Sequence, residues 1–157
     1  MMNADRLLSK ISKALHLAKL EAVLIGNAAA ALRGAPVTTL DFDFMFRDTP
    51  ANRVKLKKFA DLLDSIVMRP YHPASALFRV VNDEIGLQVD FMPKIHGVSS
   101  FASLRSRATA LESVGWTLQV ADLDDIIKSK RAAGRDRDKA VIGILERTRD
   151  EAKKNRK

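Results

Sequence analysis

The sequence of 157 residues contains no cysteine, one tryptophan, one tyrosine and no long apolar run. Without cysteine, the protein has no disulfide bond, no cysteine-ligated zinc site and no cysteine nucleophile. No segment approaches the roughly 20 uninterrupted apolar residues that a membrane-spanning helix requires, so no membrane span is expected. The N-terminal segment also lacks the apolar core of a signal peptide, and we expect a cytoplasmic protein.

The composition is that of a folded domain with an uneven excess of basic residues. Hydrophobic residues make up 46% of the chain, and its formal net charge is +8. We expect one domain over residues 1–146, followed by a basic C-terminal tail or helix end over residues 147–157. That last segment holds six basic and two acidic residues. It is read either as a solvated helix end or as a segment that steers RNA through phosphate contacts.

Hydrophobic periodicity predicts helices and strands that alternate irregularly. Helices are expected at about 4–19, 27–33, 48–65, 99–111, 122–133 and 136–153. Strands are expected at about 21–25, 40–46, 76–82, 86–92 and 115–120, with the third and fourth forming an antiparallel hairpin. This order favours an α/β (α+β) domain with a small mixed β-sheet, flanking helices and C-terminal helices.

The segment Asp41-Phe42-Asp43 lies inside an apolar run and carries the first candidate site. On a strand the two carboxylates point to one face, about 7 Å apart, and Phe42 points to the other. Carboxylates in apolar surroundings are costly unless they are paired or bind a metal. The pair therefore indicates a site for hard cations, which prefer oxygen ligands.

A third carboxylate, Asp90, lies in another short apolar run between Gly86 and Pro93. If that strand lies beside the one with Asp41 and Asp43, the three carboxylates converge. Such a set is typical of a two-metal site, in which two ions clamp the attacking and leaving oxygens. Upstream, Gly26-Asn27 leads a turn into a helix, where backbone N–H groups can cradle phosphates.

The ordered set Gly26-Asn27, Asp41-Phe42-Asp43 and Asp90 resembles that of the DNA polymerase β-like nucleotidyltransferase superfamily. Within it, the sequence is most similar to the AbiEii-like abortive-infection toxins. That branch has a long gap between the first two elements, then Gly-x-Pro and Thr before the Asp-x-Asp, found here as Gly34-Ala35-Pro36 and Thr39. It also has a helical Lys followed by Ala-Ala-Gly-Arg and a basic-Asp pair, found here at Lys130, residues 132–135 and Arg137-Asp138.

The resemblance implies the nucleotidyltransferase fold and a Mg²⁺-dependent transfer of a nucleoside monophosphate from an NTP to an acceptor hydroxyl. It implies that two Mg²⁺ ions are bound by Asp41, Asp43 and Asp90, and that Asp90 accepts the acceptor's proton. The implied nucleotide-binding residues are Gly26, Asn27, Thr39 and Lys130. The implied acceptor is tRNA, another RNA or a protein, and the implied context is a toxin–antitoxin pair with a cognate partner.

Three departures from the pattern keep other functions open. Asn27 replaces the usual second Gly or Ser, Val37 replaces a basic residue, and Val141 replaces an acidic one. They support an alternative in which the chain is a catalytically weak binding module or an antitoxin. A third interpretation is a basic RNA- or DNA-binding protein in which the aspartates have no catalytic role.

Overall fold

The computed structural model describes residues 2–39, 41–69, 76–113 and 115–155. Its strands are β1 (Ala22–Ile25), β2 (Phe42–Phe46), β3 (Ile66–Met68), β4 (Phe78–Asn82), β5 (Leu87–Met92), β6 (Thr109–Ser113) and β7 (Trp116–Val120). Its helices are α1 (Ala4–Ala18), α2 (Gly26–Leu32), α3 (Pro50–Leu62), α4 (Phe101–Arg107), α5 (Leu123–Ala133) and α6 (Asp136–Lys154). No helix in the described ranges has the length and apolar character needed to cross a membrane.

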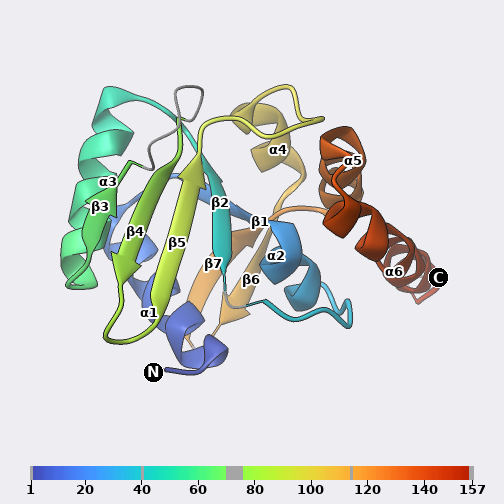
Figure 1. The fold of residues 1–157 in the computed structure, drawn as a ribbon, viewed down its shortest axis with the longest axis horizontal. Coiled ribbons are helices and arrows are strands. Elements are labelled where there is room, and N and C mark those ends of the chain that lie inside the picture. The colour runs from blue at the N-terminus through green and yellow to red at the C-terminus, as the bar shows by residue number, and fades with distance from the viewer. Residues whose placement is uncertain (1, 40, 70–75, 114, 156–157) are drawn as a thin grey trace.

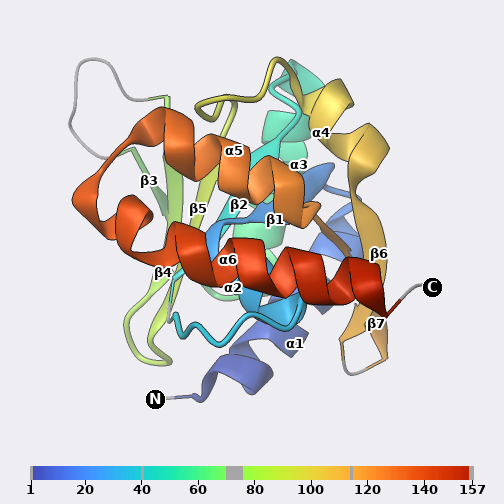
Figure 2. The same cartoon turned by 90° about the vertical axis from the view of Figure 1, so that its right-hand side faces the viewer.

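The strands form one mixed sheet in the order β3-β4-β5-β2-β1-β7-β6. Helices α1 and α3 pack together behind the sheet, and α2 lies against β1 and β2 on the other side (Figure 1). The last two helices, α5 and α6, form a packed pair over α2 (Figure 2). This arrangement confirms the predicted fold class of a mixed sheet flanked by helices, with two helices at the C-terminus.

Strand pairing at the centre of the sheet fixes which side chains share a face. Strand β2 runs parallel to β5 and antiparallel to β1, with Asp43 opposite Asp90 and opposite Ile25. The hairpin of β4 and β5 is antiparallel, as predicted. Because paired residues point to the same face of a sheet, Asp43 and Asp90 lie side by side on the face that carries α2.

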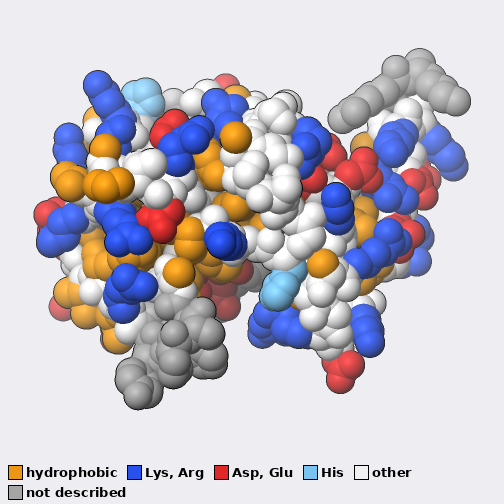
Figure 3. All heavy atoms as spheres, turned by 90° about the horizontal axis from the view of Figure 1, so that it is seen from above, with side chains coloured by type: hydrophobic (Ala, Val, Ile, Leu, Met, Phe, Trp, Pro, Cys, Tyr) orange, Lys and Arg blue, Asp and Glu red, His pale blue; other side chains and the backbone are white. Residues whose placement is uncertain are grey.

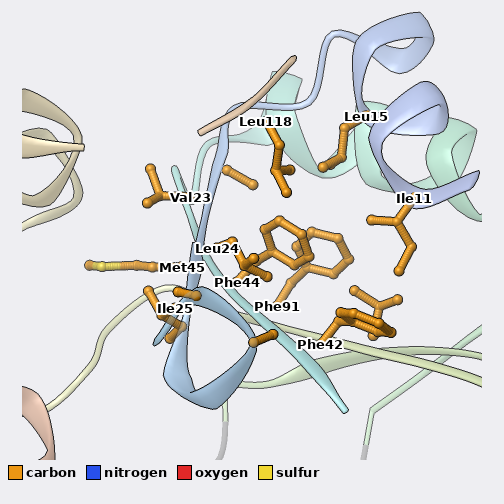
Figure 4. Packing of buried hydrophobic residues seen from close by; sticks show 14 of the residues in the cluster. Ile11, Leu15, Val23, Leu24, Ile25, Phe42, Phe44, Met45, Phe91 and Leu118 are labelled. Carbon is orange, nitrogen blue, oxygen red and sulfur yellow. The ribbon is translucent and has the colours of Figure 1, made fainter. Parts of the chain in front are cut away.

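The opposite face of the same strands forms the aromatic core. The rings of Phe44 and Phe91 stack with centroids 5.3 Å apart, and Phe59 of α3 meets Phe91 edge-on at 5.2 Å. Figure 4 shows these two stacked rings on the side of the strands that faces Ile11 and Leu15 of α1. Burying aromatic side chains stabilises a fold strongly, so Asp43 and Asp90, the acidic row of the sheet, lie on strands whose other face packs into the aromatic core.

Two strands were not predicted, and one predicted helix extends into one of them. The three residues of β3 are too few to show alternation, and they form a strand because they pair with β4. The predicted helix 99–111 is wrong beyond Arg107, since residues 109–113 form β6 against β7. Ala, Leu and Glu in that segment favour a helix, but pairing with a neighbouring strand overrides such local preferences.

Several element ends also differ from the predictions. Helix α3 ends at Leu62 and not at 65, and β2 begins at Phe42, so Asp41 directly precedes the strand. Leu40, at the start of the predicted strand, lies outside the described residues. The segment 147–154 continues α6 without a break. In that segment, Arg149 and Lys153 form ion pairs with Asp124 of α5.

Asn52 links helix α3 to the sheet through three hydrogen bonds made by a side chain that is only 1% exposed. Its Oδ1 accepts from the Glu21 backbone N–H at 3.0 Å, and its Nδ2 donates to the carbonyls of Glu21 at 3.1 Å and Arg47 at 2.7 Å. Removing the amide leaves the Glu21 N–H and the Arg47 carbonyl without these partners, whereas the Glu21 carbonyl still accepts from the Arg47 N–H.

We therefore expect Asn52→Ala to lower the free energy of unfolding by about 2 kcal/mol, since unpaired buried polar groups are costly. Urea denaturation measures the change. Asn82→Ala is the matched control, because Asn82 also bonds backbone carbonyls but at a half-buried position that water can reach. Equal losses in the two variants would contradict the role of burial at Asn52.

Candidate functional site

A cavity of about 570 Å³ opens between the acidic row of the sheet and the helices α5 and α6. All seven of the predicted site residues line it: Gly26, Asn27, Thr39, Asp41, Asp43, Asp90 and Lys130. They come from segments far apart in the sequence, which the central strands and α5 bring together. Their assigned roles remain predictions, but their convergence is a feature of the fold.

Asp43 is the carboxylate most strongly affected by this environment. Burial, followed by the nearby charges of Asp90 and Asp41, raises the pKa of Asp43 to about 6. Lys130 and Arg137 act in the opposite direction on the same pKa. A carboxylate with a raised pKa in a cavity is a candidate for a functional role, and this one lies where two acidic neighbours repel its negative charge.

Asp90 differs from Asp43 because it already has a cationic partner. Arg79 of β4 donates from Nε to Asp90 Oδ1 at 2.8 Å and from Nη2 to Oδ2 at 3.1 Å. The two-point geometry is the strongest that an arginine and a carboxylate adopt. The sequence prediction missed Arg79, although the short turn after Asn82 sets a hairpin register that places Arg79 opposite Asp90.

The donor set fits a divalent cation. Asp41, Asp43 and Asp90 offer hard oxygen ligands, and their mutual repulsion at Asp43 is the kind that a bound cation relieves. In the arrangement seen here, however, no three His, Cys, Asp or Glu side chains of the described residues are placed to hold one ion together. Asp41 is exposed in front of β2, and both oxygens of Asp90 are engaged by Arg79.

Gly26 and Asn27, the first two residues of α2 directly after β1, also line the cavity. Gly26 has a φ of +68°, and a Cβ added there would lie 3.4 Å from Asp43 Oδ2. A side chain at this position would strain the backbone and cover the Asp43 carboxylate. The amide oxygen of Asn27 is shielded from solvent and has no hydrogen-bond partner in the described part of the chain.

Thr39 has a structural role in addition to its place on the cavity wall. Its hydroxyl accepts from the Asp41 backbone N–H at 3.1 Å and donates to the Asp41 carbonyl at 3.0 Å. A threonine that closes such a local turn fixes the backbone beside it. Thr39 therefore orients the segment that leads into Asp41 and β2.

Lys130 approaches the carboxylates from α5 and is held by a buried acid on α6. Its Nζ lies 3.7 Å from Asp138 Oδ1, and the Asp138 side chain is only 2% exposed. Arg135 donates to the same carboxylate from Nε at 2.6 Å and from Nη2 at 3.3 Å. Burial lowers the pKa of Lys130, and the charge of Asp138 opposes that change.

Further basic side chains border the cavity, namely Lys94, His96, Arg135 and Arg137. The sequence prediction gave no site role to Lys94 and His96, which follow β5 in a loop whose path depends on tertiary packing. Figure 3 shows Lys and Arg side chains spread over one face of the molecule, with acidic side chains between them. The cavity thus has an acidic wall on the sheet and a mainly basic wall on the helices and on the loop after β5.

No protein-family model matches this sequence, and no curated protein is significantly similar to it. Solved structures, in contrast, share its fold. The solution structure of the antibiotic-resistance factor ANT(2'')-Ia has a TM-score of 0.58 and 15% identity, covering 96% of this chain and 91% of that chain. A crystal structure of a presumed nucleotidyltransferase from Thermotoga maritima has a TM-score of 0.59 and 18% identity, covering 94% and 89%.

A crystal structure of ANT(2'')-Ia in complex with adenylyl-2''-tobramycin also matches. Its TM-score is 0.55 at 20% identity, and the match covers 78% of this chain and 71% of that chain. At such low identities the likeness concerns the path of the backbone. The protein therefore has the nucleotidyltransferase fold.

Proposed function

We propose that the protein is a metal-dependent nucleotidyltransferase, which transfers a nucleoside monophosphate from an NTP to an acceptor hydroxyl. The observation that carries this proposal is the cavity in which Asp43 and Asp90 lie side by side, opposite Lys130. Acidic and basic walls facing each other suit a triphosphate that is bound together with cations. The nucleotidyltransferase fold of the neighbours supports the same assignment.

The basic wall would bind the phosphates. Lys130 presents a compact charge to them, and Arg137 lies close enough to Asp43 to act on the pKa of that carboxylate. Gly26 leaves the carboxylate uncovered, so the triphosphate can approach the chain closely. The Asn27 amide oxygen, which lacks a partner, would accept a hydrogen bond from a hydroxyl or amino group of the nucleotide. Thr39 would hold the backbone of the nucleotide-binding side of the cavity in place through the turn that it closes with Asp41.

The acidic wall would hold the cations and the acceptor's proton. Asp41, Asp43 and Asp90 are the residues that would bind Mg²⁺, which when bound lowers the acceptor hydroxyl's pKa and neutralises triphosphate charge. Asp90 would accept the proton of the attacking hydroxyl at a carboxylate oxygen. The leaving pyrophosphate would stay paired with Lys130 until it is released.

RNA is the acceptor that the charge distribution favours. The ANT(2'')-Ia complex contains an adenylylated aminoglycoside, tobramycin. Here the chain carries a net charge of +8, and three Lys or Arg residues besides Lys130 border the cavity. Positive charge attracts polyanions and repels polycations, so tRNA or another RNA fits better than an aminoglycoside. A protein acceptor is the alternative that labelling would reveal.

The resemblance to AbiEii-like toxins suggests the biological setting. The order of Gly26-Asn27, Asp41-Phe42-Asp43, Asp90 and Lys130 follows that branch, and these residues line one cavity. We propose that the protein is one component of a toxin–antitoxin pair. Its cognate partner would then control access to this cavity.

A second candidate function is a catalytically weak binding module of the same fold, such as an antitoxin. Two observations favour it: Arg79 engages both oxygens of Asp90, and Asn27 stands where the superfamily usually has Gly or Ser. Such a protein would bind nucleotide, a partner or both, without turnover.

One labelling experiment separates the two candidates. The protein is incubated with each α-³²P-labelled NTP, Mg²⁺ and either total RNA or a protein extract. We expect label in a discrete RNA band with at least one NTP, and no label when a chelator removes Mg²⁺. Labelling of protein alone would replace RNA as acceptor, and Mg²⁺-dependent NTP binding without any labelled product would favour the binding module.

A further inference from the structure

One row of paired residues crosses four neighbouring strands of the sheet. Met68 of β3 pairs with Arg79 of β4, which pairs with Asp90 of β5, which pairs with Asp43 of β2. Paired residues share a face, so a guanidinium and two carboxylates follow one another along this row. Asp90 therefore lies between a fixed positive charge on one side and a second carboxylate on the other.

The link between Arg79 and Asp90 is well shielded. The Asp90 side chain is 11% exposed and that of Arg79 is 33% exposed. Both carboxylate oxygens receive hydrogen bonds from Arg79, at 2.8 and 3.1 Å. Screening by water is weaker for partly buried pairs than for surface pairs, so this contact sets the position of the Asp90 carboxylate.

We propose that Arg79 is a positioning residue that keeps Asp90 aligned along the row and thereby weakens the binding of a divalent cation to the carboxylates. This inference rests on the proposed function. A cation that binds Asp43 and Asp90 has to compete with the guanidinium for the oxygens of Asp90. It also meets the repulsion of the guanidinium, which lies no farther away than about 10 Å, two strand spacings along the sheet.

The size of the effect follows from Coulomb's law. Even at about 10 Å, with an effective dielectric constant of about 20 and screening by salt at about 0.1 M, repulsion between a divalent ion and one positive charge corresponds to about a tenfold change in affinity. Arg79 would thus leave the cavity poorly loaded with cation until a nucleotide arrives with its own bound cation. The negative charge of the triphosphate offsets the repulsion, so binding of cation and nucleotide becomes coupled.

The test measures Mn²⁺ binding to the full chain without nucleotide, from the decrease in the electron paramagnetic resonance signal of free Mn²⁺. The variants are Arg79→Met, which removes the charge and keeps an apolar stem, and Asp43→Asn, which reports whether binding occurs at the carboxylates. Arg53→Met is the matched control. Arg53, on helix α3, donates hydrogen bonds from Nε and Nη2 to the two carboxylate oxygens of Asp48, as Arg79 does to Asp90. Circular dichroism checks that each variant is folded.

We expect Arg79→Met to bind Mn²⁺ about ten times more tightly than the parent, with Arg53→Met unchanged. Equal or weaker binding by a folded Arg79→Met, while the parent still binds better than Asp43→Asn, would overturn the inference and leave the proposed function standing. If neither the parent nor Arg79→Met binds better than Asp43→Asn, the carboxylates bind no cation without nucleotide and this inference fails, while the labelling experiment decides the proposed function separately.

Discussion

Asp43→Asn is expected to reduce nucleotide transfer by about 10³-fold and, in the absence of divalent cations, to stabilise the fold at pH 7. The loss of transfer follows from removing the negative charge closest to the proposed reaction, where such electrostatic contributions are largest. The gain in stability follows from the pKa of Asp43, which burial and the charges of Asp90 and Asp41 raise to about 6.

The raised pKa of Asp43 determines how the stability of the fold changes with pH. A carboxyl group whose pKa is higher in the folded state holds its proton more tightly there, so folding is favoured at low pH. As the pH rises from about 4 to about 6, the unfolded chain loses the proton first, and the parent loses about 3 kcal/mol of stability. Asn does not titrate, so the variant keeps that stability at pH 7.

Chemical denaturation between pH 4 and pH 8, with a chelator present, measures the difference. The two proteins should be similar near pH 4 and diverge above it. Asp61→Asn is the control, because Asp61 is an exposed acid on α3 that pairs with Lys57. If Asp43→Asn transfers nucleotide at the parent's rate, Asp43 does not have the role proposed for it in the site.

Asp138→Asn should raise the KM for NTP by about 100-fold and lower the free energy of unfolding by about 2 kcal/mol. Asp138 is buried between Arg135 and Lys130, and an unpaired charge left at a buried position is costly. Because Arg135 is 55% exposed, water compensates part of that cost. The pKa of Lys130, already lowered by burial, falls further when the opposing charge of Asp138 is removed.

Kinetics at two pH values distinguish this effect from a general loss of structure. Neutral Lys130 binds phosphate poorly, so the KM of Asp138→Asn should improve as the pH falls, while the parent's changes less. Asp124→Asn serves as the control, since Asp124 is an exposed acid on α5 that pairs with Arg149. A KM that is independent of pH in the Asp138 variant would contradict the role assigned to the Lys130 charge.

Most of the fold could be predicted because its central elements carry strong local signals. The alternation around Asp41-Phe42-Asp43 and the apolar run around Asp90 reflect burial on both faces of the central strands. The signals fail where pairing alone decides the structure. Residues 109–113 have the composition of a helix and form a strand, since β7 offers a free edge.

The site could be predicted in its residue types but not in its contacts. The apolar runs around them identified Asp43 and Asp90, and the family resemblance identified Lys130, whereas their partners Arg79 and Asp138 depend on register and helix packing. Arg79 lies opposite Asp90 only because the hairpin turn sets that register. Asp138 is buried only because α6 packs against α5. The sequence alone also placed Asp41 within the strand, whereas β2 begins one residue later.

Helix α6 buries few side chains for its length, and this affects the stability of the contact between Asp138 and Lys130. Of its 19 residues only Asp138 and Leu145 are buried. A helix held mainly by partly buried apolar residues such as Val141 and Ile142 and by surface ion pairs opens locally at a lower free energy than the core of its domain. Each such opening would withdraw Asp138 from Lys130 while the sheet stays intact. Binding of nucleotide in the cavity can therefore depend on how long α6 stays packed. A partner protein that binds α6 from outside could change that time.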